Sequence, residues 1–116
     1  MKTFYLLTAL CAILFTFSCS NNDTEHLVRY DATGTCYGGY IVSYTDADGS
    51  VHQVEAIGSF THEMVVENGC HAAIAASNKD SSHCSVRVSI IVDGSTAASD
   101  EQTGLDNLAR ASTVLE

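Results

Sequence analysis

Residues 85–94 read Ser-Val-Arg-Val-Ser-Ile-Ile-Val-Asp-Gly, and this stretch decides the fold class. Its apolar residues alternate with polar ones, so that one face would carry Val86, Val88, Ile90 and Val92. A period of two is the pattern of a half-buried β-strand, because successive side chains point to opposite faces of a sheet. The dipeptide Asp93-Gly94 that follows is a strong signal for a hairpin turn. The stretch therefore predicts one strand of an antiparallel pair.

Short alternations of apolar and polar residues continue on both sides of this stretch, and the chain contains no proline. Alternating Tyr40, Val42 and Tyr44 predict a strand that leads into a polar turn over 46–49. Further strands are expected at 27–33, 51–57, 60–66, 70–77 and 107–115. The last segment has enough Leu and Ala for a helix over 105–115, but its run of Ser, Thr and Val favours a strand.

Seven or eight short strands with turns every 8–12 residues indicate a small antiparallel β-sandwich. The chain has no tryptophan, and therefore no Cys-Trp-Cys spacing, which excludes a true immunoglobulin domain. The expected fold is thus an all-β, immunoglobulin-like sandwich of about seven strands, with the likeness restricted to architecture.

The first residues predict a lipoprotein signal peptide over 1–18. A positive start, Met1-Lys2, precedes an apolar or small-residue run over 4–17, which is too short to span a membrane. The run ends in Thr-Phe-Ser-Cys at 16–19, which resembles the lipobox of bacterial lipoproteins with Cys19 as the lipidated residue. An ordinary signal peptide with a chance cysteine is the alternative. Residues 19–26 would form the lipidated cysteine and a polar tether, and 27–116 the sandwich domain.

The charge of the mature chain limits which classes of binding partner are expected. All 14 acidic residues follow Cys19, against four Lys or Arg, which gives a formal charge of −10. Nucleic acid is excluded as an expected partner, because phosphate binding relies on clustered Lys and Arg. Attachment to a membrane is expected through the lipid and not through charge.

Cys36, Cys70 and Cys84 remain after removal of Cys11 with the signal and lipidation of Cys19. Three cysteines in a compartment that permits disulfides predict one bridge and one buried or free thiol, with the pairing left open. Their spacings match no zinc pattern of the C-x2-C type.

Three segments, 28–34, 41–49 and 86–94, occur in an order and spacing that resemble a known family. They read Val-Arg-Tyr-Asp-Ala-Thr-Gly, then Ile-Val-Ser-Tyr-Thr-Asp-Ala-Asp-Gly, then Val-Arg-Val-Ser-Ile-Ile-Val-Asp-Gly. Together they resemble the extracytoplasmic domain of the MmpS-type transport accessory proteins and their lipoprotein relatives. The resemblance runs from residue 28 to about residue 115.

The resemblance implies a β-sandwich anchored outside the cytoplasmic membrane that assists a large transporter and has no catalytic residues. Three features depart from the family pattern. Residues 57–60, Ile-Gly-Ser-Phe, replace a Leu-Pro-Trp segment, and Cys19 replaces a transmembrane anchor. Cys84 is the one candidate for the cysteine that in the family pairs the sixth strand with the C-terminal strand, but no cysteine follows it.

Candidate catalytic and metal-binding motifs are weak. The pair His62-Glu63 lacks the second histidine of H-E-x-x-H, and in a strand the two side chains point to opposite faces. The same alternation separates cysteine from histidine in Cys70-His71 and His83-Cys84.

Asp46 and Asp48 suggest a calcium-binding loop, but the twelfth position of an EF-hand loop would be Ile57. Asp48-Gly49 is better interpreted as the positive-φ pair of a hairpin turn. We expect no enzyme activity, no cofactor and no metal.

Tyr37 and Tyr40 flank a pair of glycines, which suggests a bulge or a close backbone approach with aromatic side chains available for ligand contact. The alternative is a bulge with one tyrosine in the core and one at the rim.

The expected function is that of a non-enzymatic envelope lipoprotein that acts as an interaction module, such as a transporter accessory. The runner-up is a surface module that binds glycans or host proteins. Both place the domain on the extracytoplasmic side, most simply at an outer membrane.

Overall fold

The computed structural model describes residues 24–79, 83–105 and 107–115. These residues form eight strands, which are β1 (Glu25–Gly34), β2 (Tyr40–Thr45), β3 (Val51–Ala56), β4 (Ser59–Glu67), β5 (His71–Asn78), β6 (Cys84–Val92), β7 (Ser95–Gly104) and β8 (Leu108–Val114). The expected signal peptide and the expected lipidation site, Cys19, lie outside the described residues. Within the described ranges, no helix is long and apolar enough to cross a membrane.

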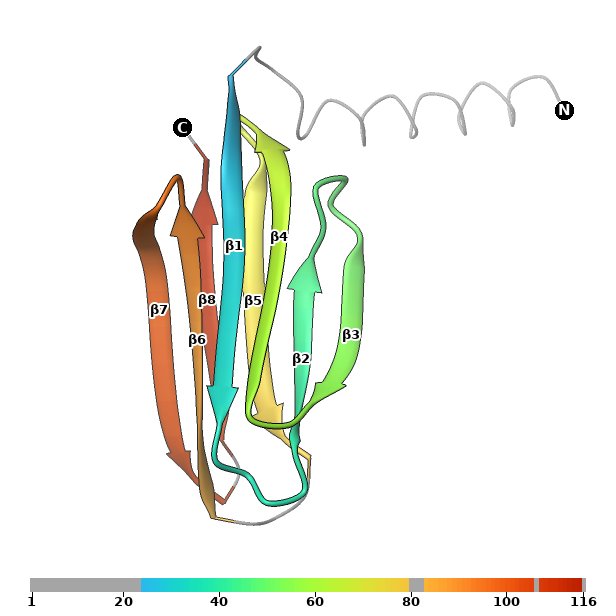
Figure 1. Cartoon of the computed structure of the whole chain (residues 1–116), viewed down its shortest axis with the longest axis vertical. Coiled ribbons are helices and arrows are strands. Elements are labelled where there is room, and N and C mark those ends of the chain that lie inside the picture. Colours follow the sequence, from blue (N-terminus) through green and yellow to red (C-terminus); the bar gives the residue numbers. More distant parts are fainter. Residues whose placement is uncertain (1–23, 80–82, 106, 116) are drawn as a thin grey trace, which may run out of the picture.

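The strands form two antiparallel sheets of four, ordered β4-β1-β6-β7 and β3-β2-β5-β8, which pack face to face (Figure 1). The predicted antiparallel β-sandwich is confirmed. The stretch 85–94 forms the centre of the first sheet, where β6 lies between β1 and β7. The turn Asp93-Gly94 joins β6 to β7 with positive φ at both residues, 50° and 86°, as a two-residue hairpin turn requires.

Two features differ from the sequence expectation. β1 begins at Glu25, so the last two residues of the expected tether already belong to the sheet. β7 was not predicted, because its residues STAASDEQTG are nearly all polar or small and it lies at a sheet edge. The C-terminal segment is the strand β8, which confirms the strand that the sequence favoured over a helix.

The core lies between the sheets and consists of the alternate residues that the period-two pattern selects. The first sheet contributes Val28, Tyr30 and Ala32 from β1 and Val86, Val88 and Ile90 from β6, each at most 2% exposed. Each fully buried Val or Ile side chain stabilises the fold by roughly 1.5–3 kcal/mol. The second sheet contributes small residues along β5 and β8, namely Ala72, Ala76, Ala109 and Ala111. These alanines let the sheets approach closely, and the contacts between the sheets gather along β5 to β8.

Candidate functional site: the Tyr37 loop

Tyr37 lies in the loop between β1 and β2 and is 98% exposed. A tyrosine ring with almost no protein contact is unusual, because aromatic rings normally bury a large apolar surface. The loop lies at the end of the sandwich opposite the start of β1 (Figure 1).

The loop that presents Tyr37 is held against the start of β6. On the β6 side, the Thr35 amide donates to the Ser85 carbonyl at 2.9 Å, and the Ser85 amide donates to Thr35 Oγ1 at 2.9 Å. One residue later, a disulfide joins Cys36 to Cys84, with 4.8 Å between their Cα atoms. The backbone next to Tyr37 is therefore anchored although its side chain is free of contacts.

Gly39 closes the loop and cannot readily be replaced. Its amide donates to the Cys36 carbonyl at 3.0 Å, and its φ is +91°. A Cβ atom at this position would lie 2.7 Å from the Ala56 carbonyl oxygen. Positive φ and close backbone approach are the two conditions that favour glycine. The paired glycines thus mark a close approach, as the sequence suggested.

The structure separates the two tyrosines that the sequence singled out. Tyr40 is fully buried, and its hydroxyl donates to the Gly58 carbonyl at 2.9 Å and lies 3.2 Å from the Ala32 carbonyl. Burial raises the pKa of this hydroxyl above its usual value. Tyr40 is a core residue that is not available to a surface ligand, and Tyr37 alone remains a candidate contact.

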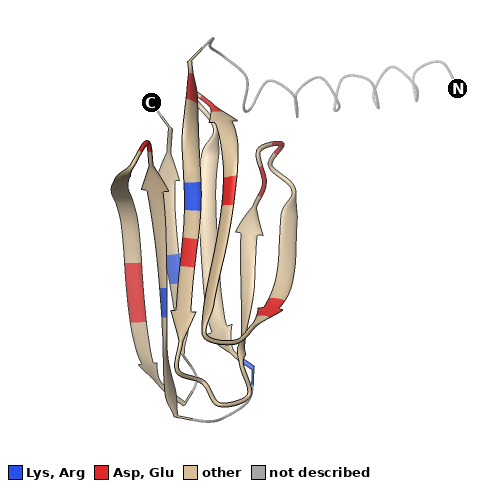
Figure 2. Ribbon diagram, in the orientation of Figure 1, with Lys and Arg blue, Asp and Glu red and all other residues tan. Residues whose placement is uncertain are grey.

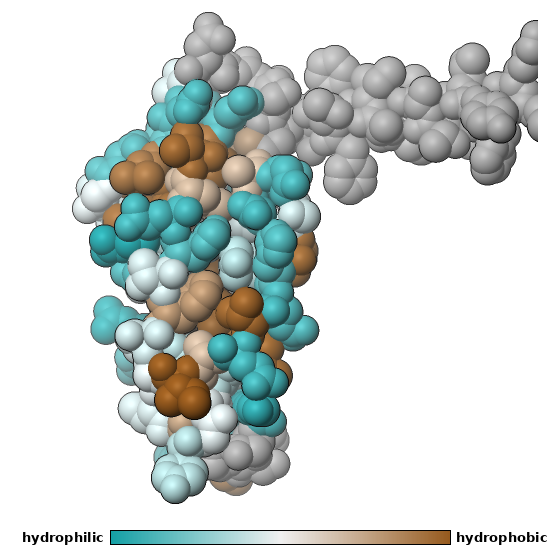
Figure 3. All heavy atoms as spheres, turned by 45° about the vertical axis from the view of Figure 1, so that its right-hand side comes forward, coloured by the Kyte–Doolittle hydropathy of each residue, from teal (hydrophilic) through white to brown (hydrophobic). Residues whose placement is uncertain are grey.

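Two further apolar side chains are exposed on nearby connections. Ile57, in the turn between β3 and β4, is 78% exposed and its Cγ1 lies beside Gly39. Leu105, after β7, is 55% exposed. Together with Tyr37 they form what we call the distal apolar set. Figure 3 shows that hydrophobic residues on this part of the surface form separate patches among hydrophilic ones.

Asn107 stabilises the connections around this end and was not singled out from the sequence. It is 5% exposed, and its amide nitrogen donates to the Cys84 carbonyl at 2.6 Å. Its side-chain oxygen accepts from the Asn78 amide at 3.1 Å, and the Asn78 side chain donates to the Leu105 carbonyl. A buried asparagine in a polar connection gives no pattern that would distinguish it from a turn residue.

The disulfide pairing, which the sequence left open, is Cys36–Cys84. It therefore differs from the family pattern, in which the sixth strand is bridged to the C-terminal strand. Cys70 is 2% exposed and its sulfur is also disulfide-bonded, so the expectation of one bridge and one thiol is wrong. Disulfides are compatible with an extracytoplasmic location.

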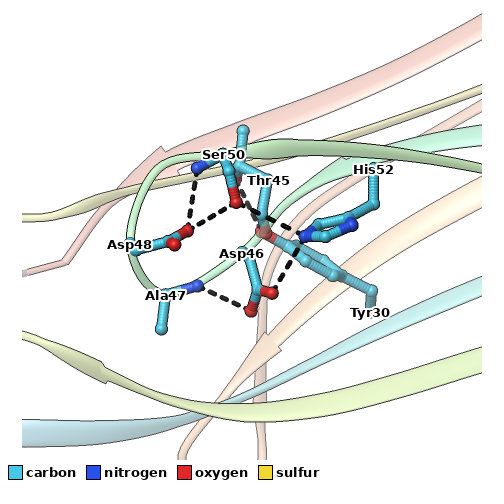
Figure 4. A network of polar contacts seen from close by, with 7 residues as sticks. All are labelled: Tyr30, Thr45, Asp46, Ala47, Asp48, Ser50 and His52. Atoms are coloured by element: carbon cyan, nitrogen blue, oxygen red, sulfur yellow. Dashed lines mark hydrogen bonds and ion pairs between the residues drawn. The ribbon is translucent and has the colours of Figure 1, made fainter.

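The loop over 46–50 is a hairpin connection whose carboxylates bind groups of the loop itself (Figure 4). Asp48 Oδ1 accepts from the Ser50 amide at 3.0 Å and from the Ser50 hydroxyl at 2.6 Å. Asp46 Oδ1 accepts from the Ala47 amide at 2.8 Å, and its Oδ2 lies 3.0 Å from His52 Nε2. No group of three or more His, Cys, Asp or Glu side chains within the described ranges is placed to hold a metal ion.

The turn chemistry of this loop differs in one detail from the expectation. Gly49 has a φ of +87°, but Asp48 has no positive φ. The Asp46 amide donates to the Ser50 carbonyl at 2.8 Å, and the Gly49 amide donates to the Asp46 carbonyl at 3.0 Å. This is a three-residue loop with one left-handed glycine, in place of a two-residue turn with two positive φ values.

His62 and Glu63 point to opposite faces of β4, as alternation predicted. His62 packs between the sheets against Tyr44, with 4.7 Å between ring centroids, whereas Glu63 is exposed. The two side chains cannot act on one metal ion or one substrate.

A polar cluster at the opposite end of the sandwich, near the start of β1, was not predicted. His26 Nδ1 lies 2.6 Å from Asp93 Oδ2, and His26 Nε2 lies 3.0 Å from Asn68 Oδ1. These hydrogen bonds, first that to Asp93 and then that to Asn68, raise the pKa of His26. The hydrogen bond from His26 and the Leu27 amide lower the pKa of Asp93. The cluster ties β1 to two turns that only the fold brings together.

No protein-family model matches this chain, and no curated protein matches it.

Proposed function

We propose that this protein is a non-enzymatic envelope lipoprotein whose sandwich presents the Tyr37 loop to a partner protein, such as a membrane transporter. The observation that carries the proposal is the 98% exposure of Tyr37 on a loop that a disulfide anchors at the neighbouring residue. Binding energy at protein interfaces is concentrated in a few residues, among which tyrosine is enriched. An anchored backbone also lowers the entropy lost on binding.

The placement of the two ends supports this proposal. The Asn68 amide donates to the Thr24 carbonyl at 2.8 Å, so the end of the expected tether lies beside the turn between β4 and β5. From there β1 runs for ten residues, about 33 Å, toward the Tyr37 loop. A lipid on Cys19 would hold the first end near the membrane and leave the distal apolar set directed away from it.

Site-specific photo-crosslinking in intact envelopes tests the proposal. A photoreactive phenylalanine analogue would replace Tyr37 in the full chain, and in a matched control it would replace Val114, which is 53% exposed near the other end. We expect a defined protein adduct from position 37 and none from position 114. Adducts at neither position, or the same adducts at both, would contradict the proposal.

Glycan binding is the second candidate, because an exposed tyrosine ring can stack on a sugar ring as it does on other apolar faces. A glycan array probed with the wild-type chain and with Tyr37→Ala separates the two functions. Binding to a defined glycan that Tyr37→Ala abolishes would favour this second function. A blank array, together with a protein adduct at position 37, would remove it.

A further inference from the structure

The sandwich is closed along one side and open along the other. On the closed side β7 lies against β8, and the sheets are in contact along β5 to β8. On the open side the first sheet ends at β4, whereas the hairpin of β2 and β3 extends beyond it (Figure 1). Several inward apolar side chains at this side are only partly buried, namely Tyr44 and Val54 on the hairpin and Phe60 and Met64 on β4.

The backbone of β4 is unpaired along its outer edge. The Gly34 amide donates to the Gly58 carbonyl at 2.9 Å, and the Asn68 amide to the Thr24 carbonyl at 2.8 Å. These bonds bracket the β1–β4 ladder and fix which residues face β1, because bonded pairs alternate along an antiparallel ladder. The amides and carbonyls of Ser59, Thr61, Glu63, Val65 and Glu67 therefore point away from β1. No other described strand pairs with β4.

Few of the features that normally prevent the addition of a strand occur along this edge. β4 is nine residues long, reads SFTHEMVVE and contains no lysine and no proline. Its register with β1 is continuous, without a bulge. Long regular edges of this kind are templates for an added strand unless lysine, proline or bulges prevent it, and the two glutamates of β4 leave open the addition of a basic segment. By contrast, the β8 edge is partly capped, since the Arg110 amide donates to Asp100 Oδ2 at 3.0 Å.

β3 is also an edge, but an added strand there would cover less. β3 has six residues, and a strand added beyond it would extend the second sheet away from the first. A strand added to β4 would instead lie over the hairpin of β2 and β3 and cover its partly buried inner face. The His62 ring packs against Tyr44 in the same region, and its Nε2 is inaccessible to solvent and has no hydrogen-bond partner among the described residues.

The charge along β4 indicates the charge that a partner segment should carry. Its outward side chains include Glu63 and Glu67, four residues apart on one face, and the strand carries no Lys or Arg (Figure 2). Glu63 lies opposite Arg29, but the Arg29 guanidinium pairs with Asp31 at 3.2 Å. Within the described ranges neither glutamate forms an ion pair. A hollow of about 370 Å³, lined by Thr61, Glu63 and residues of β1, adjoins the edge and can receive side chains of an added strand.

A second copy of this chain fits the edge poorly. Antiparallel pairing of two β4 strands centred on Glu63 would place Glu63 opposite its own equivalent. Centring on Val65 would place Glu63 opposite Glu67 of the other copy. Like charges directly opposite one another destabilise a strand pair. The mature charge of −10 adds to this repulsion.

We propose that the edge of β4 is a docking site for an extended segment of a partner protein, which adds to the first sheet as a fifth strand. Its inward side chains are apolar and cover the β2–β3 hairpin, and its outward side chains include Lys or Arg opposite Glu63 and Glu67. Backbone hydrogen bonds provide affinity in this mode, and the alternate side chains provide specificity. The inference rests on the proposed function only in assuming a protein partner, and it uses a surface other than the Tyr37 loop.

Titration of the full chain, purified in mild detergent, with a capped peptide Lys-Val-Thr-Val-Lys-Val tests this proposal. In antiparallel pairing the two lysines can lie opposite Glu67 and Glu63. A matched peptide with glutamate in place of both lysines keeps the apolar face and reverses the charge. We expect at least tenfold tighter binding of the lysine peptide, and slower amide exchange at Glu63, Val65 and Glu67 when it is bound.

Two sets of variants keep the test decisive. Glu63→Pro removes an outward amide that β1 does not use, whereas Glu63→Ala keeps that amide, so only the proline should abolish binding by the backbone. The double variant Glu63→Lys with Glu67→Lys should reverse the preference to the glutamate peptide, even if the proline variant does not fold.

Four results would overturn the proposal: no binding of either peptide, equal binding of both, amide protection on β3 in place of β4, or self-association through β4 in sedimentation. None of these bears on crosslinking at position 37, so the two proposals fail separately. Crosslinking at position 37 could equally fail while the lysine peptide binds to β4.

Discussion

Cys36 and Cys84 join segments that are 48 residues apart in the chain. A bridge of this span stabilises a small domain by about 2–4 kcal/mol, mainly by restricting the unfolded chain. We expect Cys36→Ala with Cys84→Ala to lower the free energy of unfolding by about that amount in a denaturant titration. Tyr37→Ala is the matched control and should change it by less than about 0.5 kcal/mol, because its side chain is 98% exposed. An equal loss in both would show that the ring stabilises this end as much as the bridge does, which contradicts the expectation.

His26 makes stability depend on pH, since both of its ring nitrogens face acceptors on Asp93 and Asn68. Its pKa is raised above 6.5, so its contribution is complete below about pH 6.5 and is lost as the pH rises through the raised value. The pKa of Asp93 is lowered below 3.8, so its contribution is present above about pH 4 and is lost as the pH falls through the lowered value. The pair therefore stabilises the fold most between about pH 4 and 6.5.

Melting temperatures of the wild type and His26→Gln, measured from pH 4 to 9, check this expectation. The glutamine can still form hydrogen bonds but does not titrate. The difference between the two proteins should be largest near pH 5–6 and should shrink above neutral pH. His71→Gln is the control, because His71 is exposed and lies outside this cluster. A constant difference across the pH range would contradict the assignment.

At the scale of the elements, Asp100 of β7 protects the edge of β8 by accepting the Arg110 amide. This bond is the main reason that the pKa of Asp100 is lowered. We expect Asp100→Ala to speed amide exchange at Arg110 and to promote association in sedimentation, because an exposed amide on an edge strand is a template for pairing. Asp100→Asn keeps an acceptor oxygen and should have a much smaller effect. Equal behaviour of the two variants would show that charge, and not the hydrogen bond, protects the edge.

Whether a strand could be predicted from the sequence depends on whether one of its faces is buried. β6 alternates over its whole length, so its pattern predicts both its existence and its buried residues. β7 has only intermediate and exposed residues, since it closes the first sheet at an edge, and its composition therefore carries no period-two signal. The hairpin turn before it was the one local indication that a strand follows.

The candidate site was predictable only in part, for a related reason. The glycines at 38–39 marked a close backbone approach and alternation placed Tyr40 in a strand with Val42, but nothing local indicated that Tyr37 is exposed. Tyr40 is buried because Gly34 leaves room for its ring, with a Cβ there lying 2.6 Å from Tyr40 Cδ1. Pairs such as Cys36–Cys84 and His26–Asp93 depend on contacts between distant segments, which sequence spacing does not encode.

At the scale of the whole molecule, the two ends of the sandwich carry different groups, although exposed apolar side chains such as Leu27 and Val114 also occur near the start of β1. The end near the start of β1 carries the polar cluster of His26, Asn68 and Asp93, which suits a position close to lipid headgroups and water. The opposite end carries the distal apolar set, and the open edge of β4 runs between the two. An anchor at the first end would therefore leave both proposed contact surfaces accessible to partners in the envelope.

The anchor itself gives the last prediction. If Cys19 is lipidated, Cys19→Ser should release the chain from the membrane fraction, since stable attachment needs more than one acyl chain and each buried methylene contributes about 0.8 kcal/mol. Cys11→Ser lies within the expected signal peptide and should leave anchoring unchanged. Intact mass of the purified wild type should show a chain that begins at Cys19 with acyl groups added. One sulfur cannot carry both a lipid and a disulfide, so a mass that places Cys19 in a disulfide would refute lipidation. Membrane attachment that survives Cys19→Ser would refute it as well, and would leave the distal apolar set or the β4 edge as the means of attachment.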